Sequence, residues 1–108
     1  MVEYKDIDII KNMKTVDWLK AELLTNVALL HNSLVSGEEN TKDHLEDIIS
    51  NIILESYVLG KRLGINYKDI NNALIENIKL NLIEEHKIER WYGDLSLLLE
   101  FVQADKEK

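Results

Sequence analysis

The chain of 108 residues contains no cysteine and no proline. Without cysteine it can form neither a disulfide framework nor a thiolate zinc site, and it has no Cys nucleophile. Without proline no helix is broken from inside, so glycine is the main punctuation of the chain. The four glycines, at positions 37, 60, 64 and 93, mostly follow helical patterns. These absences favour an all-α protein and exclude chemistry that depends on cysteine.

Basic residues are outnumbered, and long apolar runs are missing. Thirteen Lys and Arg stand against twenty Asp and Glu, which gives a formal net charge of -7. The resulting field repels phosphate backbones, so we expect no duplex nucleic acid as a partner. A small phosphorylated ligand that arrives with Mg²⁺ is compatible with this charge. Runs such as Val27 to Leu30 fall far short of the roughly 18 apolar residues that cross a membrane, so we expect no membrane span.

The N-terminal segment "MVEYKDIDII" carries acidic residues where a signal peptide needs a basic start and then an apolar core. We therefore expect the protein to stay in the cytoplasm. The length predicts a single domain, 1–108, with a core at about 15–99 and a charged tail at 104–108 that frays. A domain of this size would gain considerably from self-association.

Helix start and stop signals divide the chain into helices at about 6–13, 16–36, 42–62, 67–90 and 95–103. Thr15, Thr41 and Asn66 are the predicted N-caps, because their side-chain oxygens can accept from free backbone N–H groups. Four main helices joined by short turns, followed by a short C-terminal helix, predict an antiparallel helical bundle.

Two polar stripes interrupt the apolar faces of the second and third predicted helices. Glu22 and Asn26 lie beside a broad apolar arc and are flanked on their other side by Trp18. The third helix carries Asp47, Asn51 and Glu55 four residues apart. Stripes hemmed in by large apolar groups on both sides are unlike an ordinary solvated face.

If these two helices are antiparallel, Glu22 and Asn26 would face Asp47 and Asn51 across the bundle. A site so rich in oxygen atoms suits Mg²⁺ or Mn²⁺ better than zinc. The alternative is that the stripes are boundary positions, solvated or bonded to other side chains. The residues alone leave both interpretations open.

Three residues near the end of the fourth predicted helix also have two interpretations. Lys87 and Arg90 suit phosphate oxygens, or they complement the negative end of a helix. Trp91 suits stacking on a base, or it closes the end of the bundle. The three histidines at 31, 44 and 86 match no ligand motif, and the chain has no P-loop or G-x-G-x-x-G.

Three segments, "WLKAELLTNVALL", "YVLGKRLGI" and "EEHKIERWYGDLSLL", agree in order and spacing with one family. They resemble the short bacterial MazG-like proteins over roughly 15–99. The resemblance implies an all-α fold, assembly into dimers or tetramers, and distant kinship with MazG nucleoside triphosphate pyrophosphohydrolases and all-α dimeric dUTPases. Those relatives use Mg²⁺ to cleave a nucleoside triphosphate into a monophosphate and pyrophosphate.

The metal motif of these enzymes is E-E-x-x-E on one helix and E-x-x-D on the next, but this chain departs from both. In the first motif only Glu22 is acidic. In the second Ile48 replaces the Glu and Asn51 replaces the Asp, with Asp47 as the nearest carboxylate. The resemblance implies a metal set of Glu22, Asp47 and Asn51, with Glu46 or Glu55 completing it. It also implies nucleotide contacts from further side chains: Trp18, Asn26, Lys87, Arg90 and Trp91.

Two functions follow from these patterns. The first is a nucleotide pyrophosphohydrolase in which carboxylates hold Mg²⁺ or Mn²⁺ against the phosphates of a nucleotide. The second is a non-catalytic helical module that associates with itself and binds a small ligand or a protein. The depleted carboxylate motif favours the second, and the paired stripes together with the resemblance favour the first.

Overall fold

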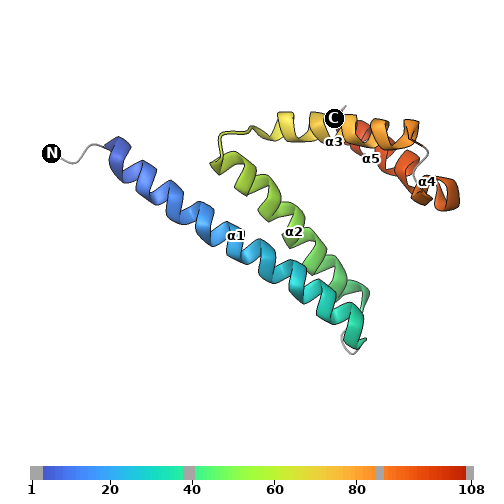
Figure 1. Ribbon diagram of the computed structural model, residues 1–108, viewed down its shortest axis with the longest axis horizontal. Coiled ribbons are helices and arrows are strands. Elements are labelled where there is room, and N and C mark those ends of the chain that lie inside the picture. Colours follow the sequence, from blue (N-terminus) through green and yellow to red (C-terminus); the bar gives the residue numbers. More distant parts are fainter. Residues whose placement is uncertain (1–3, 38–40, 85–86, 107–108) are drawn as a thin grey trace. The chain divides into compact units, whose positions relative to one another are not determined.

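The computed structural model describes residues 4–37, 41–84 and 87–106 and forms helices throughout (Figure 1). The helices are α1 (Tyr4–Ser36), α2 (Lys42–Arg62), α3 (Tyr67–Ile83), α4 (Lys87–Tyr92) and α5 (Asp94–Lys106). The described ranges contain no strand, and the predicted all-α class is confirmed. None of the helices in these ranges combines the length and the apolar composition that a bilayer crossing needs.

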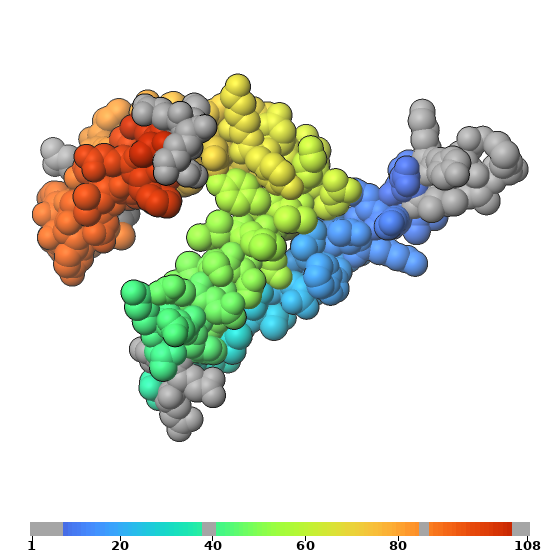
Figure 2. All heavy atoms as spheres, turned by 180° about the vertical axis from the view of Figure 1, so that it is seen from behind, coloured from blue at the N-terminus to red at the C-terminus, as the bar shows by residue number. Residues whose placement is uncertain are grey.

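The chain divides into two compact units, and the first ends at Ile65. In this unit α1 and α2 form an antiparallel hairpin (Figure 1). Figure 2 shows their side chains in contact along the hairpin, with α1 in blue to cyan and α2 in green. Leu19 of α1 and Ile48 of α2 are almost fully buried, as are two polar residues, Ser33 and Glu55. The hairpin core is thus small and partly polar.

Helix α1 is continuous, whereas the sequence predicted a short helix at 6–13 and a second one capped by Thr15. The Thr15 hydroxyl does not cap a new helix; it donates to the backbone oxygen of Lys11, 2.8 Å away and one turn earlier. Inside a helix a threonine hydroxyl can donate to the carbonyl four residues earlier. With no glycine or proline between the two predicted helices, nothing breaks the first one, and α1 reaches Ser36.

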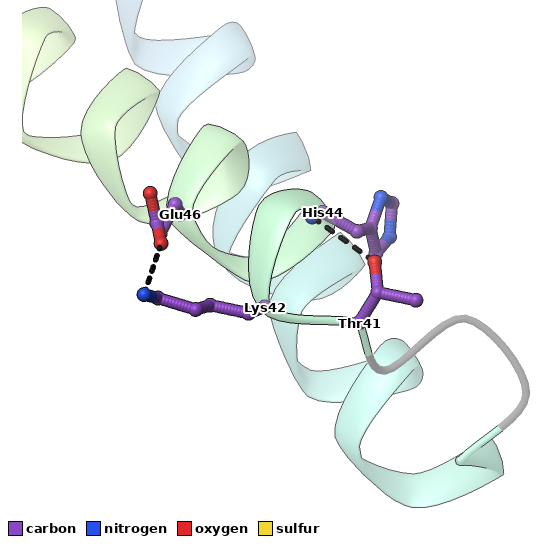
Figure 3. Close-up of polar contacts among 4 residues, drawn as sticks. All are labelled: Thr41, Lys42, His44 and Glu46. Atoms are coloured by element: carbon purple, nitrogen blue, oxygen red, sulfur yellow. Dashed lines mark hydrogen bonds and ion pairs between the residues drawn. The ribbon is translucent and has the colours of Figure 1, made fainter.

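Both ends of α2 follow the predicted signals. The Thr41 side chain accepts a hydrogen bond from the backbone N–H of His44 at 3.2 Å (Figure 3), so the predicted N-cap is confirmed. At the other end Gly64 has a φ of 92°, and its N–H donates to the oxygen of Lys61 while that of Ile65 donates to Gly60. These bonds satisfy the last carbonyls of α2 and turn the chain.

The second compact unit runs from Asn66 to the C-terminus. Asn66 accepts from the backbone N–H of Asp69 at 2.8 Å, which confirms the second predicted cap. Helix α3 packs against α5, and α4 also contacts α5 (Figure 1). Ile75 and Ile78 of α3 are buried. This unit therefore has a separate small apolar core.

Two boundaries in this unit differ from the prediction. The helix expected at 67–90 ends at Ile83, and α4 begins at Lys87. No glycine or proline marks this end, and contacts between distant segments decide it, because the chain must turn back for α5 to reach α3. The tail expected to fray at 104–108 is helical to Lys106, while 107–108 lies outside the described residues.

Candidate functional site

A partly buried hydrogen bond joins the two helices of the hairpin near its middle. Asn26 of α1 donates from Nδ2 to Oε1 of Glu55 on α2, at 2.7 Å. Glu55 is only 8% exposed, and Asn26 is half-buried. A hydrogen bond to a charged acceptor in such surroundings is short and strong. It holds one carboxylate in a defined position at the hairpin interface.

This bond corrects the predicted register of the hairpin. Asn26 lies across from Glu55, one turn beyond Asn51 and two turns beyond Asp47, so it does not face those two residues as the sequence predicted. The short connection at 37–41 is the physical reason. Side chains at similar distances from a connection meet, whereas Glu22 lies mid-way along α1 and Asp47 lies in the second turn of α2.

A second contact near the connection supports this register. Ser33 Oγ lies 3.3 Å from Nε2 of His44, and Ser33 is buried. Ser33 is in the last turn of α1 and His44 in the first turn of α2. In the sequence His44 matched no ligand motif, and it was assigned no role. Their contact belongs to the packing of the hairpin.

Five polar side chains lie along one side of the hairpin. Residues four apart on a helix advance by about 40°, so Glu22 and Asn26 follow a line along α1, as Asp47, Asn51 and Glu55 do along α2. The two helices are antiparallel (Figure 1). One turn toward the N-terminus from Asn26 on α1, and one turn toward the N-terminus from Glu55 on α2, therefore both lead to the same side of the hairpin. We call these five residues the polar row.

The members of the polar row differ in accessibility. Glu55 is buried, Glu22 and Asn51 are half-buried, and Asp47 is exposed. Glu22 precedes Asn26 by one turn, which is about 6 Å along the axis, so Glu22 and Glu55 are the carboxylates nearest in level. Asp47 lies at the opposite end of the row from Glu22. The structure therefore brings Asn26 and Glu55 together, but it does not bring Glu22 and Asp47 to one level.

Glu46 stands apart from the row. It lies two positions before the buried Ile48, which places it on the opposite side of α2. Its carboxylate is 3.7 Å from Nζ of Lys42 in an exposed ion pair (Figure 3). Its predicted part in a metal site gains no geometric support.

Within the described residues, no three side chains of His, Asp or Glu lie close enough to hold a metal ion. A cluster of several ions, which needs many carboxylates, does not fit this row. Mg²⁺ is, however, commonly held by one or two carboxylates together with nucleotide phosphates and water. Glu22 and Glu55 fit a single ion of that kind, whereas Asn51 lies on the other side of Glu55, about 12 Å from Glu22 along the axis. The metal roles of these residues stay predictions.

The predicted nucleotide contacts divide between the two units. Trp18 is 60% exposed and precedes Glu22 by about one turn on the polar side of α1. Lys87, Arg90 and Trp91 belong to α4 in the second unit, where all three are exposed. The Trp91 ring packs edge-on against that of Tyr92, with centroids 6.4 Å apart. The roles of these side chains stay predictions.

Sequence reasoning missed the contact that closes the open end of the hairpin. Asn12 Nδ2 donates to the backbone oxygen of Arg62 at 3.0 Å. The predicted helix break near Thr15 separated Asn12 from the hairpin and hid this contact. The signal was present in the spacing, because Asn12 lies two heptads before Asn26 and therefore on nearly the same face of a continuous helix.

A family model described as the MazG-like family matches residues 9–95, which includes the entire polar row. No curated protein and no solved structure matches the chain significantly.

Proposed function

Because this chain belongs to the MazG-like family and is thus related to the MazG-type pyrophosphohydrolases, we propose that it binds a nucleoside triphosphate with one Mg²⁺ or Mn²⁺ ion and releases pyrophosphate. The observation that carries the proposal is the bond between Asn26 and Glu55. It orients a buried carboxylate on the face that also carries the half-buried Glu22. A preset carboxylate loses less entropy on metal binding than a freely rotating one.

Each residue of the row has a distinct part in this proposal. Glu22 and Glu55 would hold the ion together with water, and Asn51, one turn beyond Glu55, would offer its uncharged amide to a phosphate oxygen. Asn26 acts as a positioning residue, since its amide fixes the Glu55 carboxylate. When bound, the ion neutralises phosphate charge and activates a water molecule. Asp47 lies two turns, about 12 Å, beyond Glu55 and would act only through the negative charge that it adds to the row.

Trp18 supplies the contact to the base. Its exposed ring lies on the same side of α1 as Glu22 and about one turn away. Stacking of a base on an aromatic ring contributes about 1–3 kcal/mol and tolerates different bases. Such a contact would allow the protein to accept several nucleotides, including modified ones.

The proposed assembly is a homodimer formed through the side of the hairpin opposite the polar row. This apolar side carries exposed side chains from both helices, namely Met13, Leu24, Val27, Leu34, Ile49 and Ile53. The side runs along two antiparallel helices, so a twofold axis can superpose it on itself in a second copy. Two hairpins together would make a four-helix core and leave both polar rows open.

The test is pyrophosphate release by the purified protein with Mg²⁺ or Mn²⁺ and a panel of standard and modified nucleoside triphosphates. We expect Asn26→Ala to reduce the rate by about 10- to 100-fold, as for residues that orient metal ligands. Glu22→Gln and Glu55→Gln should reduce it at least as much. Glu76→Gln on α3 removes the same charge away from the row and should leave the rate unchanged.

Absence of pyrophosphate release from the entire panel would overturn the proposed hydrolysis. Release that Glu22→Gln leaves intact would overturn the assignment of the row. Far-UV circular dichroism of each variant shows whether a lower rate comes from the loss of a metal-binding side chain or from unfolding of the protein.

A second candidate function is a non-catalytic dimeric module. It is favoured by the absence of three converging acidic or histidine side chains within the described residues. The two candidates differ in thermal stability, because a ligand that binds the native state must raise it. Mg²⁺ with a non-hydrolysable nucleotide should raise the Tm of the proposed hydrolase and leave that of a module without a nucleotide site unchanged.

A further inference from the structure

A pocket of about 630 Å³ lies at the open end of the hairpin, away from the polar row. It is lined by residues of α1 between Asp8 and Thr15 and by Arg62, the last residue of α2. The lining residues are Asp8, Ile9, Lys11, Asn12, Met13, Thr15 and Arg62. This volume falls within the range of about 300–1,000 Å³ that small-molecule sites occupy.

The pocket is locally positive in a chain whose net charge is -7. Lys11 and Arg62 bring two cations to it from two helices, against the single carboxylate of Asp8. Neither cation forms an ion pair with a carboxylate in the described part of the chain. Lys14 lies three residues after Lys11 on α1 and adds positive charge beside the pocket.

Asn12 contacts both the backbone and the side chain of Arg62 at the pocket. The Asn12 amide donates to the backbone oxygen of Arg62, which satisfies a carbonyl that the end of α2 would otherwise leave open. The Asn12 carbonyl oxygen is 3.5 Å from one guanidinium nitrogen of the same residue. A guanidinium has five N–H donors, so most of them remain available to a ligand.

We propose that this pocket binds the phosphate group of a small phosphomonoester. A phosphate dianion gains from both Lys11 and Arg62, and the planar fork of Arg62 matches two of its oxygens. Ile9 also lines the pocket and offers an apolar contact for the organic part of the ligand. A monocarboxylate would fit the fork but gain less from the second cation.

This site is separate from the proposed metal site. Lys11 and Glu22 lie on the same face of α1 but about three turns, or roughly 16 Å, apart. The phosphate site needs no metal ion, since side-chain cations supply the positive charge. Binding in the presence of a chelator therefore tests the pocket without testing the polar row.

The experiment is isothermal titration calorimetry of the full chain with phenyl phosphate in EDTA at low salt. We expect saturable binding that Lys11→Gln and Arg62→Gln each weaken at least about tenfold, the effect of losing one hydrogen bond to a charged group. Arg62→Lys, which keeps the charge but loses the fork, should be intermediate. Lys79→Gln on α3 removes the same charge elsewhere and should bind as the unaltered protein does.

Four results would overturn this inference. They are no saturation up to about 10 mM phenyl phosphate, an equal loss of affinity in all the variants including Lys79→Gln, benzoate binding as tight as phenyl phosphate binding, and loss of binding in Glu22→Gln. The last result would place the ligand at the polar row. Lys11 and Arg62 are exposed, and far-UV circular dichroism confirms that each variant is folded.

Discussion

At the scale of single residues, Glu55 is the side chain on which the candidate site depends. A carboxylate that is 8% exposed needs a hydrogen-bond donor, and Asn26 supplies one at 2.7 Å. No buried side-chain nitrogen or oxygen of the described residues lacks a hydrogen-bond partner, so the Glu55 carboxylate is satisfied. A buried polar pair in so small a core specifies how two helices meet, because another register would leave both groups unpaired.

Comparison of a single variant with a double variant of this pair tests its contribution to stability. Asn26→Leu removes the donor and leaves the buried carboxylate unsatisfied, so it should lower the free energy of unfolding by about 1–3 kcal/mol. The double variant Asn26→Leu with Glu55→Met replaces both partners by apolar groups of similar shape and should recover most of the loss. Urea denaturation at neutral pH measures both.

Asn32→Leu is the matched control, because Asn32 is an exposed asparagine on the same helix. It should change the free energy of unfolding by less than about 0.5 kcal/mol. If Asn26→Leu alone and the double variant lower the free energy of unfolding equally, the unpaired Glu55 carboxylate is not the cause of the loss.

At the scale of elements, the junction between α4 and α5 shows how a short helix is fixed in place. Gly93 has a φ of 69° and ends α4, and α5 begins at the next residue. Glu89 of α4 then accepts from the hydroxyl of Ser96 at 2.5 Å and from its backbone N–H at 2.9 Å. The carboxylate thus satisfies an open N–H in the first turn of α5 and favours the positive end of that helix.

These bonds predict a pH dependence of stability. The Ser96 hydroxyl and then the backbone N–H groups of Ser96 and Leu95 stabilise the charged carboxylate and lower the pKa of Glu89 from its usual 4.5. A carboxyl whose pKa is lower in the folded state stabilises the fold above its unfolded value and loses that contribution as pH falls through the folded value. The stability that this junction adds should therefore disappear below pH 4.5, as the carboxylate takes up its proton.

The comparison of Glu89→Gln with the unaltered protein checks this directly. The variant should be less stable at pH 7, and the two curves of stability against pH should converge below pH 4.5. NMR titration of the Glu89 carboxyl should give a midpoint below the usual value. A constant difference between the two proteins at all pH values would contradict the assigned cause.

At the scale of the whole molecule, far more large apolar side chains are exposed than are buried in the described chain. Leu19, Ile48, Ile75 and Ile78 are the buried apolar residues of the described chain, while many large apolar side chains are exposed. Single exposed apolar residues are common, but a continuous apolar side along a hairpin marks a contact surface. In the proposed dimer, self-association through this side gives two such hairpins a shared core.

Two positions on α1 allow a test of the proposed dimer with a matched control for the added charge. Val27 and Leu29 are 47% and 42% exposed, and they lie on opposite sides of the hairpin. Val27→Glu places a carboxylate on the apolar side and should convert the dimer to a monomer in light scattering after size exclusion. Leu29→Glu introduces the same charge on the side of the polar row and should leave the dimer intact. A monomeric unaltered protein, or dissociation by both variants, would contradict the proposed interface.

The sequence by itself determined the all-α class, the caps at Thr41 and Asn66 and the polar stripes. These are local features, because a cap or an apolar period involves residues within one or two turns of each other. The single domain, the cytoplasmic location and the ligands stay predictions. The MazG-like assignment, made from three short segments, is confirmed by the match over residues 9–95.

Only the tertiary structure decided how those elements meet. The pairing of Asn26 with Glu55, the unbroken course of α1 past Thr15 and the end of α3 at Ile83 each depend on contacts between distant segments. Local sequence signals do not predict such contacts. A polar stripe shows which side chains share a face of one helix, but it does not show which residue of the neighbouring helix lies opposite. The connection at 37–41 and the packing around Leu19 and Ile48 settle that register, and with it which carboxylates can meet a ligand.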